Sequence, residues 1–332
     1  MYASGFAGSA NSSHGRYPRL NHILIIYAKL DSLMADGVYI HLDATSSVLP
    51  HLKARLPDAA TQLYVVQVPP APASTVLATF PPSESPPESL VWSIGVIGIT
   101  GAPETEFWFW SSAEEAHTTS EDADKDKEDF RTAYTQFAQM LKFIGRAYPE
   151  KGTLFVGSLH TWVASHIPCS SRNYMSGPWV KFVFSEDTLP LQDSRAQGIG
   201  SMYFFESMAV EELDEVIQTS TVLRTKTTLA AASNTGAYLV SSEEKRAQAW
   251  CFISREGAIG SVYVRPEVRG IGLGKETMGK ELKKEFVHRK FVIAFVLTTN
   301  IASMRLCQSL GGRRALEVVW VGILLSQFRD NN

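Results

Sequence analysis

The stretch with the clearest chemical potential lies between Val262 and Met278, where three glycines alternate with other residues. Gly270, Gly272 and Gly274 follow a strand-like run and a proline, and they precede a helical segment. The N–H groups at the start of a helix have no partner within the helix, and glycines let an anion approach them closely. The spacing therefore predicts a loop that binds a phosphate group.

Two common phosphate loops do not fit these letters. An ATP-type loop, GxxxxGK[ST], needs a glycine where Arg269 stands and a hydroxyl residue where Glu276 stands. A dinucleotide loop, GxGxxG, needs its third glycine at Lys275 or at Thr277, and it opens a parallel βαβ unit rather than following hairpin strands. What remains is the pattern R-x-x-G-x-G, which ends at Gly274.

That pattern resembles the acyl-CoA loop of the GNAT superfamily of N-acyltransferases. The segment NIASMRLCQSLGG, from Asn300 to Gly312, resembles the downstream helix signature of the same superfamily. The resemblance implies a GNAT fold that binds acetyl-CoA or another acyl-CoA as co-substrate. It implies cofactor contacts at these residues of the strand, the loop and the helix: Val262, Tyr263, Val264, Arg269, Gly270, Ile271, Gly272, Leu273, Gly274, Lys275, Asn300 and Ser303.

Physical reasons support these contacts. The helix start offers N–H donors and a partial positive charge to the pyrophosphate of coenzyme A, and Arg269 and Lys275 add charge-assisted contacts. The N–H groups of Val262 and Val264 are expected to pair with the pantetheine arm and the thioester carbonyl along an open strand edge. The alternative is a glycine-rich turn that binds nothing.

Three residues are candidates for the catalytic chemistry: Tyr263, Asn300 and Cys307. Many superfamily members carry a tyrosine where this chain has Cys307, and that tyrosine is the expected acid for the leaving thiolate. A thiol with a reference pKa near 8.5 could donate the proton instead, whereas a small buried residue without a chemical role is the equal alternative. Asn300 also has an alternative role as a helix cap.

Within the GNAT superfamily, the sequence resembles the glycine N-acyltransferase-like group. The resemblance rests on Arg224-Thr225 after the first helix of the second half, on the run AQAWCFISREGAIGSVYVRPEVRG and on VWVGI near the end, and it covers about residues 205–325. Members of this group carry a glutamate base early in the strand before the loop, where this chain has Ala258. The remaining candidates for the base are Tyr263, Glu256 and Asp193.

The second half supplies the elements that must position this loop. Ser207 is expected to cap a helix, three antiparallel strands with short connections follow, and the helix after the loop has an apolar face. The expected strands are 236–242, 247–254, 258–266, 291–299 and 315–325, and a further helix spans 300–312. The fold class is therefore α/β (α+β), with a mixed, mostly antiparallel sheet flanked by helices.

The first half is rich in β-branched and aromatic runs that predict strands. The expected strands are 61–68, 74–80, 90–99, 105–112, 152–159 and 178–185, with hairpin connections between the early ones. An acidic loop over 114–129 precedes a helix whose apolar stripe runs from Phe130 to Tyr148. By resemblance, this half is a degenerate GNAT-like domain on the acceptor side. We expect domains at 1–190 and 191–332, joined by a linker over 186–201.

Composition limits the partners. The 332 residues carry a formal net charge of −3, so no overall field attracts nucleic acid or anionic lipid. The sequence contains no run of 18 or more apolar residues, so we expect no membrane span. The scattered Cys169, Cys251 and Cys307 argue against a zinc site and disulfides and favour the cytoplasm. Residues 1–30 lack acidic residues, which faintly resembles a mitochondrial transit peptide; a floppy terminus is the favoured alternative.

The sequence thus predicts an acyl-CoA-dependent N-acyltransferase, a monomer or homodimer, that acylates a small-molecule amine or an amino acid by direct attack in a ternary complex. The alternative is a non-catalytic acyl-CoA-binding protein on a retired acyltransferase fold, which the missing glutamate and tyrosine allow. Peptide N-termini are a weaker third possibility for the acceptor.

Overall fold

The computed structural model describes residues 37–68, 74–99, 104–115, 123–190, 194–220, 222, 224–242 and 245–329. Residues 1–30, with their faint resemblance to a transit peptide, and Asp193 lie outside these residues. Within them, no helix is both long and apolar enough to cross a bilayer.

The strands form one 12-stranded sheet in the order β1-β2-β3-β4-β5-β12-β6-β11-β10-β9-β8-β7. The strands are β1 (Tyr39–Ile40), β2 (Thr75–Ala78), β3 (Ser93–Ile97), β4 (Phe107–Ser111), β5 (Thr153–His160), β6 (Arg172–Ser185), β7 (Tyr203–Glu206), β8 (Ser233–Leu239), β9 (Ala247–Ile253), β10 (Ala258–Val264), β11 (Phe291–Leu297) and β12 (Arg313–Leu324). The helices are α2 (Ala44–Ser47), α3 (Leu49–Ala54), α4 (Ala60–Gln67), α6 (Ala123–Ala147), α7 (Thr161–Ser165), α8 (Ser194–Met202), α9 (Leu213–Thr219), α10 (Lys226–Ala230), α11 (Leu273–Phe286) and α12 (Ile301–Ser309).

The two halves repeat one order of elements. Short helices follow β1 and β7, three antiparallel strands come next, and a long helix (α6 or α11) leads to a strand that pairs in parallel with the last of the three. A short helix and a final long strand complete each half. This is the GNAT order, so the predicted fold class and the GNAT-like character of the first half are confirmed.

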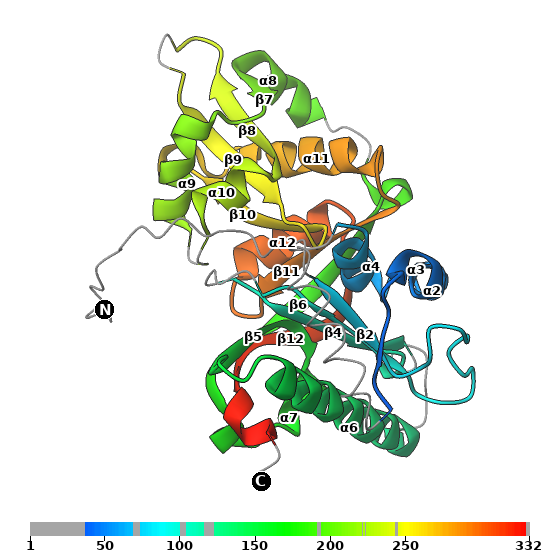
Figure 1. Cartoon of the computed structure of the whole chain (residues 1–332). Helices are drawn as coiled ribbons and strands as arrows, with labels where there is room; N and C mark the ends of the chain where they lie inside the picture. The colour runs from blue at the N-terminus through cyan, green and yellow to red at the C-terminus, as the bar shows by residue number, and fades with distance from the viewer. Residues whose placement is uncertain are drawn as a thin grey trace.

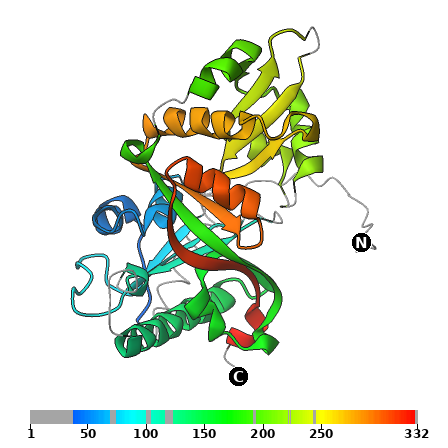
Figure 2. The ribbon, with the colours of Figure 1, turned by 180° about the vertical axis from the view of Figure 1, so that it is seen from behind.

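The final strands of the two halves exchange places. β12 lies between β5 and β6, and β6 lies between β12 and β11, so each final strand borders the parallel pair of the other half (Figures 1 and 2). The two exchanged strands also pair with each other antiparallel. The halves therefore share one continuous sheet, and the boundary at residues 190/191 stays a prediction.

Helices cover both faces of this sheet. We call one the α4 face, which carries α3, α4, α9 and α10, and the other the α11 face, which carries α6, α7, α11 and α12 (Figure 1). On β6, Val180, Phe182 and Phe184 point into the core under α11 and α12, while Val183 joins the core under α4. Full burial of each such side chain contributes about 1.5–3 kcal/mol, so the alternation along β6 fixes its register between the halves.

Most predicted elements of the second half are confirmed, including three sequential antiparallel strands, the helix after the loop, and the strand-helix-strand that ends the chain. Ser207 does not cap a helix, because a 3₁₀ turn at 210–212 precedes α9 and the Ser207 hydroxyl donates to Asn234 O at 3.5 Å. Helix α8 and strand β7 occupy the segment expected to be a linker and its continuation.

In the first half, the predicted strand over 61–68 is wrong, because this run forms α4. The residues from Ala60 to Val66 are all buried, the polar Thr61 and Gln62 included, so the run shows no helical periodicity and looks like a buried strand in the sequence. Helix α6 begins at Ala123, inside the stretch expected to be an acidic loop, and the aromatic stripe from Phe130 lies on that helix as predicted. Hairpin pairing of β2, β3 and β4 is confirmed.

One irregularity separates β10 from β11. These parallel strands pair only at Ala258 with Ile293 and at Ile259 with Ala294. Beyond them β10 shifts register against β9 between Gly260 and Tyr263, and Ser261 takes a left-handed backbone with a φ of 49°. A bulge of this kind bends its strand. The edge of β10 that faces β11 is therefore open from Gly260 onwards.

This bulge predicts a difference between two variants. The left-handed region costs a β-branched residue about 1–2 kcal/mol, whereas glycine adopts it without strain. We expect Ser261→Val to lower the melting temperature by several degrees relative to Ser261→Gly, measured by circular dichroism. Equal melting temperatures would show that Ser261 does not hold this conformation in solution.

Candidate active site

The glycine loop lies between a 3₁₀ turn at 266–268 and the start of α11. Gly270 and Gly272 have φ values of 83° and 96°, and Gly272 is the residue that precedes the helix. Both values fall in the left-handed region, which explains glycine at these positions. Gly274 has a different reason, because a Cβ there would lie 2.9 Å from Val264 Cγ2. Its absence lets α11 pack closely against β10.

The loop offers a set of free main-chain donors. The first helical hydrogen bond joins Glu276 N to Gly272 O at 3.1 Å. The N–H groups of residues 270–275 donate to no other described residue. Six unpaired donors at the positive end of a 14-residue helix are typical of an anion-binding site. The structure thus brings together the predicted loop residues in a form that fits a pyrophosphate.

The open edge of β10 continues from this loop. Arg265 N donates to Gln248 O on β9 at 2.9 Å, which fixes the direction of alternate main-chain groups. The N–H groups of Val262 and Val264 therefore point away from β9, towards the gap between β10 and β11. This is the geometry expected for pairing with an extended ligand.

The cationic residues of the loop differ in their surroundings. Arg269 Nε donates to Val264 O at 2.9 Å, and its guanidinium lies 5.7 Å from the centre of the Tyr263 ring. Arg269 thus spans the open edge of β10 rather than pointing freely outwards. Lys275 is half-buried in the first turn of α11 and has no ion-pair partner among the described residues.

Asn300 begins α12, and its side-chain oxygen accepts a hydrogen bond from Ser303 N at 3.1 Å. The capping role that Asn suits is therefore present. Asn300 is exposed and Ser303 half-buried, and both follow β11 at the end where it has separated from β10. A contact between these residues and a cofactor stays a prediction.

Cys307 points into the core under α12. Its side chain is buried against Met278, Leu282 and neighbouring residues, and burial raises the pKa of its thiol to about 12. At neutral pH the thiol therefore stays protonated, and it is a poorer proton donor than a thiol in water. These surroundings suit a packing residue.

Tyr263 lies on the α4 face of β10. Its half-buried ring stacks on Trp250, with 4.7 Å between the ring centres. Its hydroxyl group forms no hydrogen bond with the described residues. The side chain is therefore held by its ring and keeps a free polar end.

Ala258, which stands where the glutamate base was expected, is buried in the core beneath α4. Glu256 lies in the turn between β9 and β10, where the next residue, Gly257, contacts Tyr64 and Arg289. It is thus at the paired end of β10, away from the bulge.

One carboxylate near the gap was missed in the sequence. Glu104, from the first half, accepts a hydrogen bond at Oε1 from Thr225 N at 3.3 Å. The neighbouring Arg224 lies over the bulge: its Nη2 is 4.0 Å from the position that a Cβ on Gly260 would take. No sequence signal links positions 104 and 225, because only the docking of the two halves brings them together.

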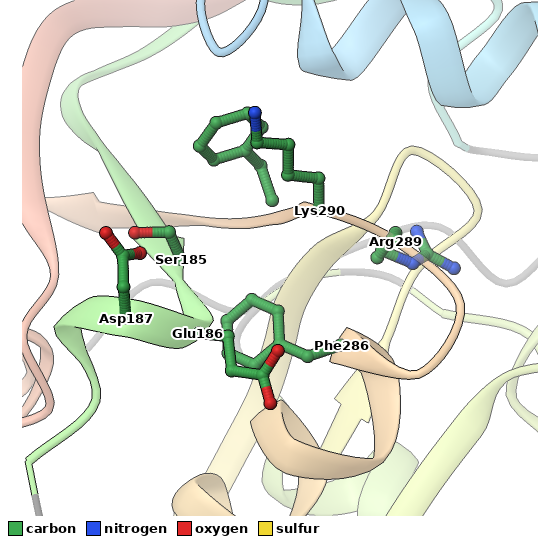
Figure 3. Close-up of a pocket in the computed structure, with 7 residues that line it drawn as sticks. Ser185, Glu186, Asp187, Phe286, Arg289 and Lys290 are labelled. Atoms are coloured by element: carbon green, nitrogen blue, oxygen red, sulfur yellow. The ribbon is translucent and has the colours of Figure 1, made fainter.

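A pocket of about 640 Å³ lies elsewhere, at the C-terminal end of α11 and the start of β11 (Figure 3). Its lining is Ser185, Glu186, Asp187, Phe286, Arg289, Lys290 and Phe291. Helix α11 separates it from the glycine loop by its full length, roughly 20 Å at 1.5 Å per residue. It is therefore distinct from the open edge of β10. Within the described part of the chain, no three potential metal-ligating side chains gather.

Comparisons with known proteins agree with this geometry. Residues 35–182 match a family model described as the acyl-CoA N-acyltransferase verG N-terminal domain. Residues 234–321, which contain the glycine loop, match the model of the FR47-like protein family. No curated protein matches the sequence significantly. The fold and both models support the GNAT superfamily, while the glycine N-acyltransferase-like group stays a prediction.

Solved structures share the arrangement at low identity. A Drosophila protein is 12% identical, with a TM-score of 0.57, over 88% of this chain and 99% of its own. A GCN5-related N-acetyltransferase from Sphaerobacter thermophilus is 10% identical, with a TM-score of 0.48, over 88% and 96%. A tandem GNAT protein from the clavulanic acid biosynthesis pathway is 14% identical, with a TM-score of 0.43, over 87% and 98%. Of these three, only the Drosophila protein has a TM-score above 0.5, and at 12% identity its likeness concerns the fold alone.

The loop geometry predicts the effect of charge at Gly270. A Cβ at this position would meet nothing within 4 Å, and Asn and Asp tolerate a left-handed backbone better than other side chains. Gly270→Asp adds an anion beside the expected pyrophosphate, whereas Gly270→Asn adds the same shape without charge. We expect the Asp variant to bind coenzyme A about tenfold more weakly than the Asn variant in calorimetric titrations. Equal affinities would place the phosphates elsewhere.

Proposed function

We propose that this chain is an acyl-CoA-dependent N-acyltransferase of the GNAT superfamily, which its fold and the two family models support. It transfers an acetyl or other short acyl group to the amine of a small molecule or an amino acid, by direct attack in a ternary complex. The observation that carries the proposal is the open edge of β10 beside the unpaired N–H groups of residues 270–275. Together they match the extended arm and the pyrophosphate of coenzyme A.

The loop and β10 divide the work of binding. Residues 270–275 hold the pyrophosphate through main-chain donors, with Lys275 adding positive charge. Val262 and Val264 offer N–H groups to the pantetheine arm and to the thioester oxygen, where negative charge develops as the amine attacks. Asn300 and Ser303 border the same gap from α12.

The transfer requires one bond to form and one to break. The amine nitrogen bonds to the thioester carbon, the carbon–sulfur bond breaks, and the ammonium proton must leave to a base or to water. The thiolate that departs takes up a proton from solvent or from a side chain. Because burial raises the pKa of Cys307 to about 12, we assign it to packing rather than to this step.

We assign the base to Glu104. It is a half-buried carboxylate, one of its oxygens is oriented by Thr225 N, and the neighbour of Thr225 in the chain, Arg224, lies over the bulge of β10. Glu104 would take the role of the glutamate that was expected at position 258, and it would do so from the other half of the chain. Tyr263, with its free hydroxyl, is the second candidate, while Glu256 lies at the paired end of the strand.

A non-catalytic acyl-CoA-binding role is the alternative. The buried Ala258 and Cys307 favour it, because they remove the acid and the base expected at their positions. Release of free thiol from acetyl-CoA, measured with and without a panel of amines, separates the two roles. Binding without amine-dependent release would identify a binding protein.

Glu104→Gln tests the assignment of the base. The amide keeps the shape and accepts from Thr225 N, but it cannot take a proton. We expect a fall in kcat of about 100-fold with unchanged affinity for coenzyme A, since a general base contributes about 10²–10⁴-fold. Glu84→Gln, on an exposed residue of the same half, is the matched control. A kcat within about threefold of the parent would transfer the role to Tyr263 or to water.

A further inference from the structure

A chain of contacts borders the point where β10 and β11 separate on the α4 face. We call it the gap rim; its members are Glu104, Thr105, Arg224, Gly260, Phe295 and Trp320. Both halves of the chain contribute to it. It therefore borders the place where the acceptor must meet the thioester, if the proposed function holds.

The rim can be followed contact by contact. Arg224 Nη2 lies over Gly260, and its neighbour Thr225 binds Glu104. The next residue, Thr105, accepts a hydrogen bond at Oγ1 from Trp320 Nε1 at 3.2 Å. Trp320 meets Phe295, which follows Ala294, the last residue of β11 that pairs with β10.

One arc of the rim is aromatic. The rings of Phe295 and Trp320 meet edge to face with their centres 5.0 Å apart, and Trp179 packs on Trp320 at 5.5 Å. All three side chains are half-buried rather than enclosed in the core. Gly157 makes room for this arrangement, because a Cβ there would lie 3.0 Å from Trp320 Nε1. Partly exposed rings of this kind bind flat apolar groups well.

The opposite arc carries two unlike charges. Arg224 is half-buried and forms no hydrogen bond or ion pair with any residue that the structure describes. Glu104 has one oxygen bound to a main-chain N–H, and it does not pair with Arg224. A half-buried guanidinium without a carboxylate partner is costly unless a ligand supplies one.

We propose that the acceptor is an α-amino acid with a free carboxylate and a flat apolar side chain. Arg224 binds its carboxylate, Glu104 lies at its amine, and Phe295, Trp320 and Trp179 receive its side chain. This proposal rests on the proposed function and names its acceptor class. It follows from the arrangement of two charges and an aromatic arc around one gap.

Three amines test this class. L-Phenylalanine has both the ring and the carboxylate, phenethylamine lacks the carboxylate, and L-alanine lacks the ring. With acetyl-CoA as donor, we expect kcat/KM for L-phenylalanine to exceed that for each of the others about tenfold or more. Equal or higher values for phenethylamine or L-alanine would overturn the proposal.

Two variants assign the contacts. Arg224→Gln should raise KM for L-phenylalanine about 10- to 100-fold and change KM for phenethylamine far less. Phe295→Leu should raise KM for L-phenylalanine more than KM for L-alanine. Arg255→Gln, on an exposed arginine in the β9–β10 turn, is the matched control and should leave all three amines unaffected. If Arg224→Gln raised KM equally for all three amines, the contact between Arg224 and the carboxylate would be wrong.

A binding measurement separates this proposal from the proposed function. N-Acetyl-L-phenylalanine is titrated in the presence of coenzyme A, and binding is followed by the fluorescence of the seven tryptophans, which include Trp179 and Trp320. Saturable quenching supports the acceptor class if the Arg224→Gln variant binds the ligand more weakly. This holds even if no amine releases thiol from acetyl-CoA, and in that case only the proposed transfer reaction is wrong. Absence of saturable quenching at millimolar concentrations would overturn the acceptor class, whatever the enzyme does with other amines.

Discussion

Two parallel strands that stop pairing after two residues leave main-chain donors exposed in the middle of a sheet, and the rest of the site depends on this separation. The bulge at Ser261 turns β10 away from β11 while α11 and α12 continue to pack on one face. The N–H groups of Val262 and Val264 thereby face a gap instead of a neighbouring strand. The glycine loop at the end of β10 extends the same row of donors to the start of α11.

The exchange of final strands explains why the two halves act as one site. β6 from the first half borders β11, and β12 from the second half borders β5, so neither half completes its sheet alone. The aromatic arc of the gap rim lies on these shared strands: Trp179 on β6, Trp320 on β12 and Phe295 on β11. Glu104 of the first half binds the main chain of the second half at Thr225, next to Arg224, which lies over Gly260. The side of the gap expected for the acceptor is thus built by docking, while the loop belongs to one half.

The sequence was informative where function rests on local backbone geometry. The alternation of Gly270, Gly272 and Gly274 indicated the loop, since left-handed positions and close helix–strand packing each require glycine. The fold class also followed from the order of strands and helices in the second half. Asn300 as a cap followed from its residue type.

What the sequence did not reveal has physical causes. Helix α4 resembles a strand in the sequence because it is buried on all sides, so its polar and apolar residues do not alternate with a helical period. The place of Cys307 in the core depends on which way α12 rotates, which its letters do not determine. Glu104 and Arg224 come from segments about 120 residues apart in sequence, and no local pattern joins them. Sites formed between halves are the part that sequence reasoning reaches last.

Hydrogen–deuterium exchange of the main-chain amides, with and without coenzyme A, tests the central claim most directly. The account predicts slower exchange on binding at Val262, at Val264 and over residues 270–275, because these N–H groups are unpaired in the free protein and bonded in the complex. Unchanged exchange at these amides, or protection confined to the pocket around Arg289 and Lys290, would contradict it.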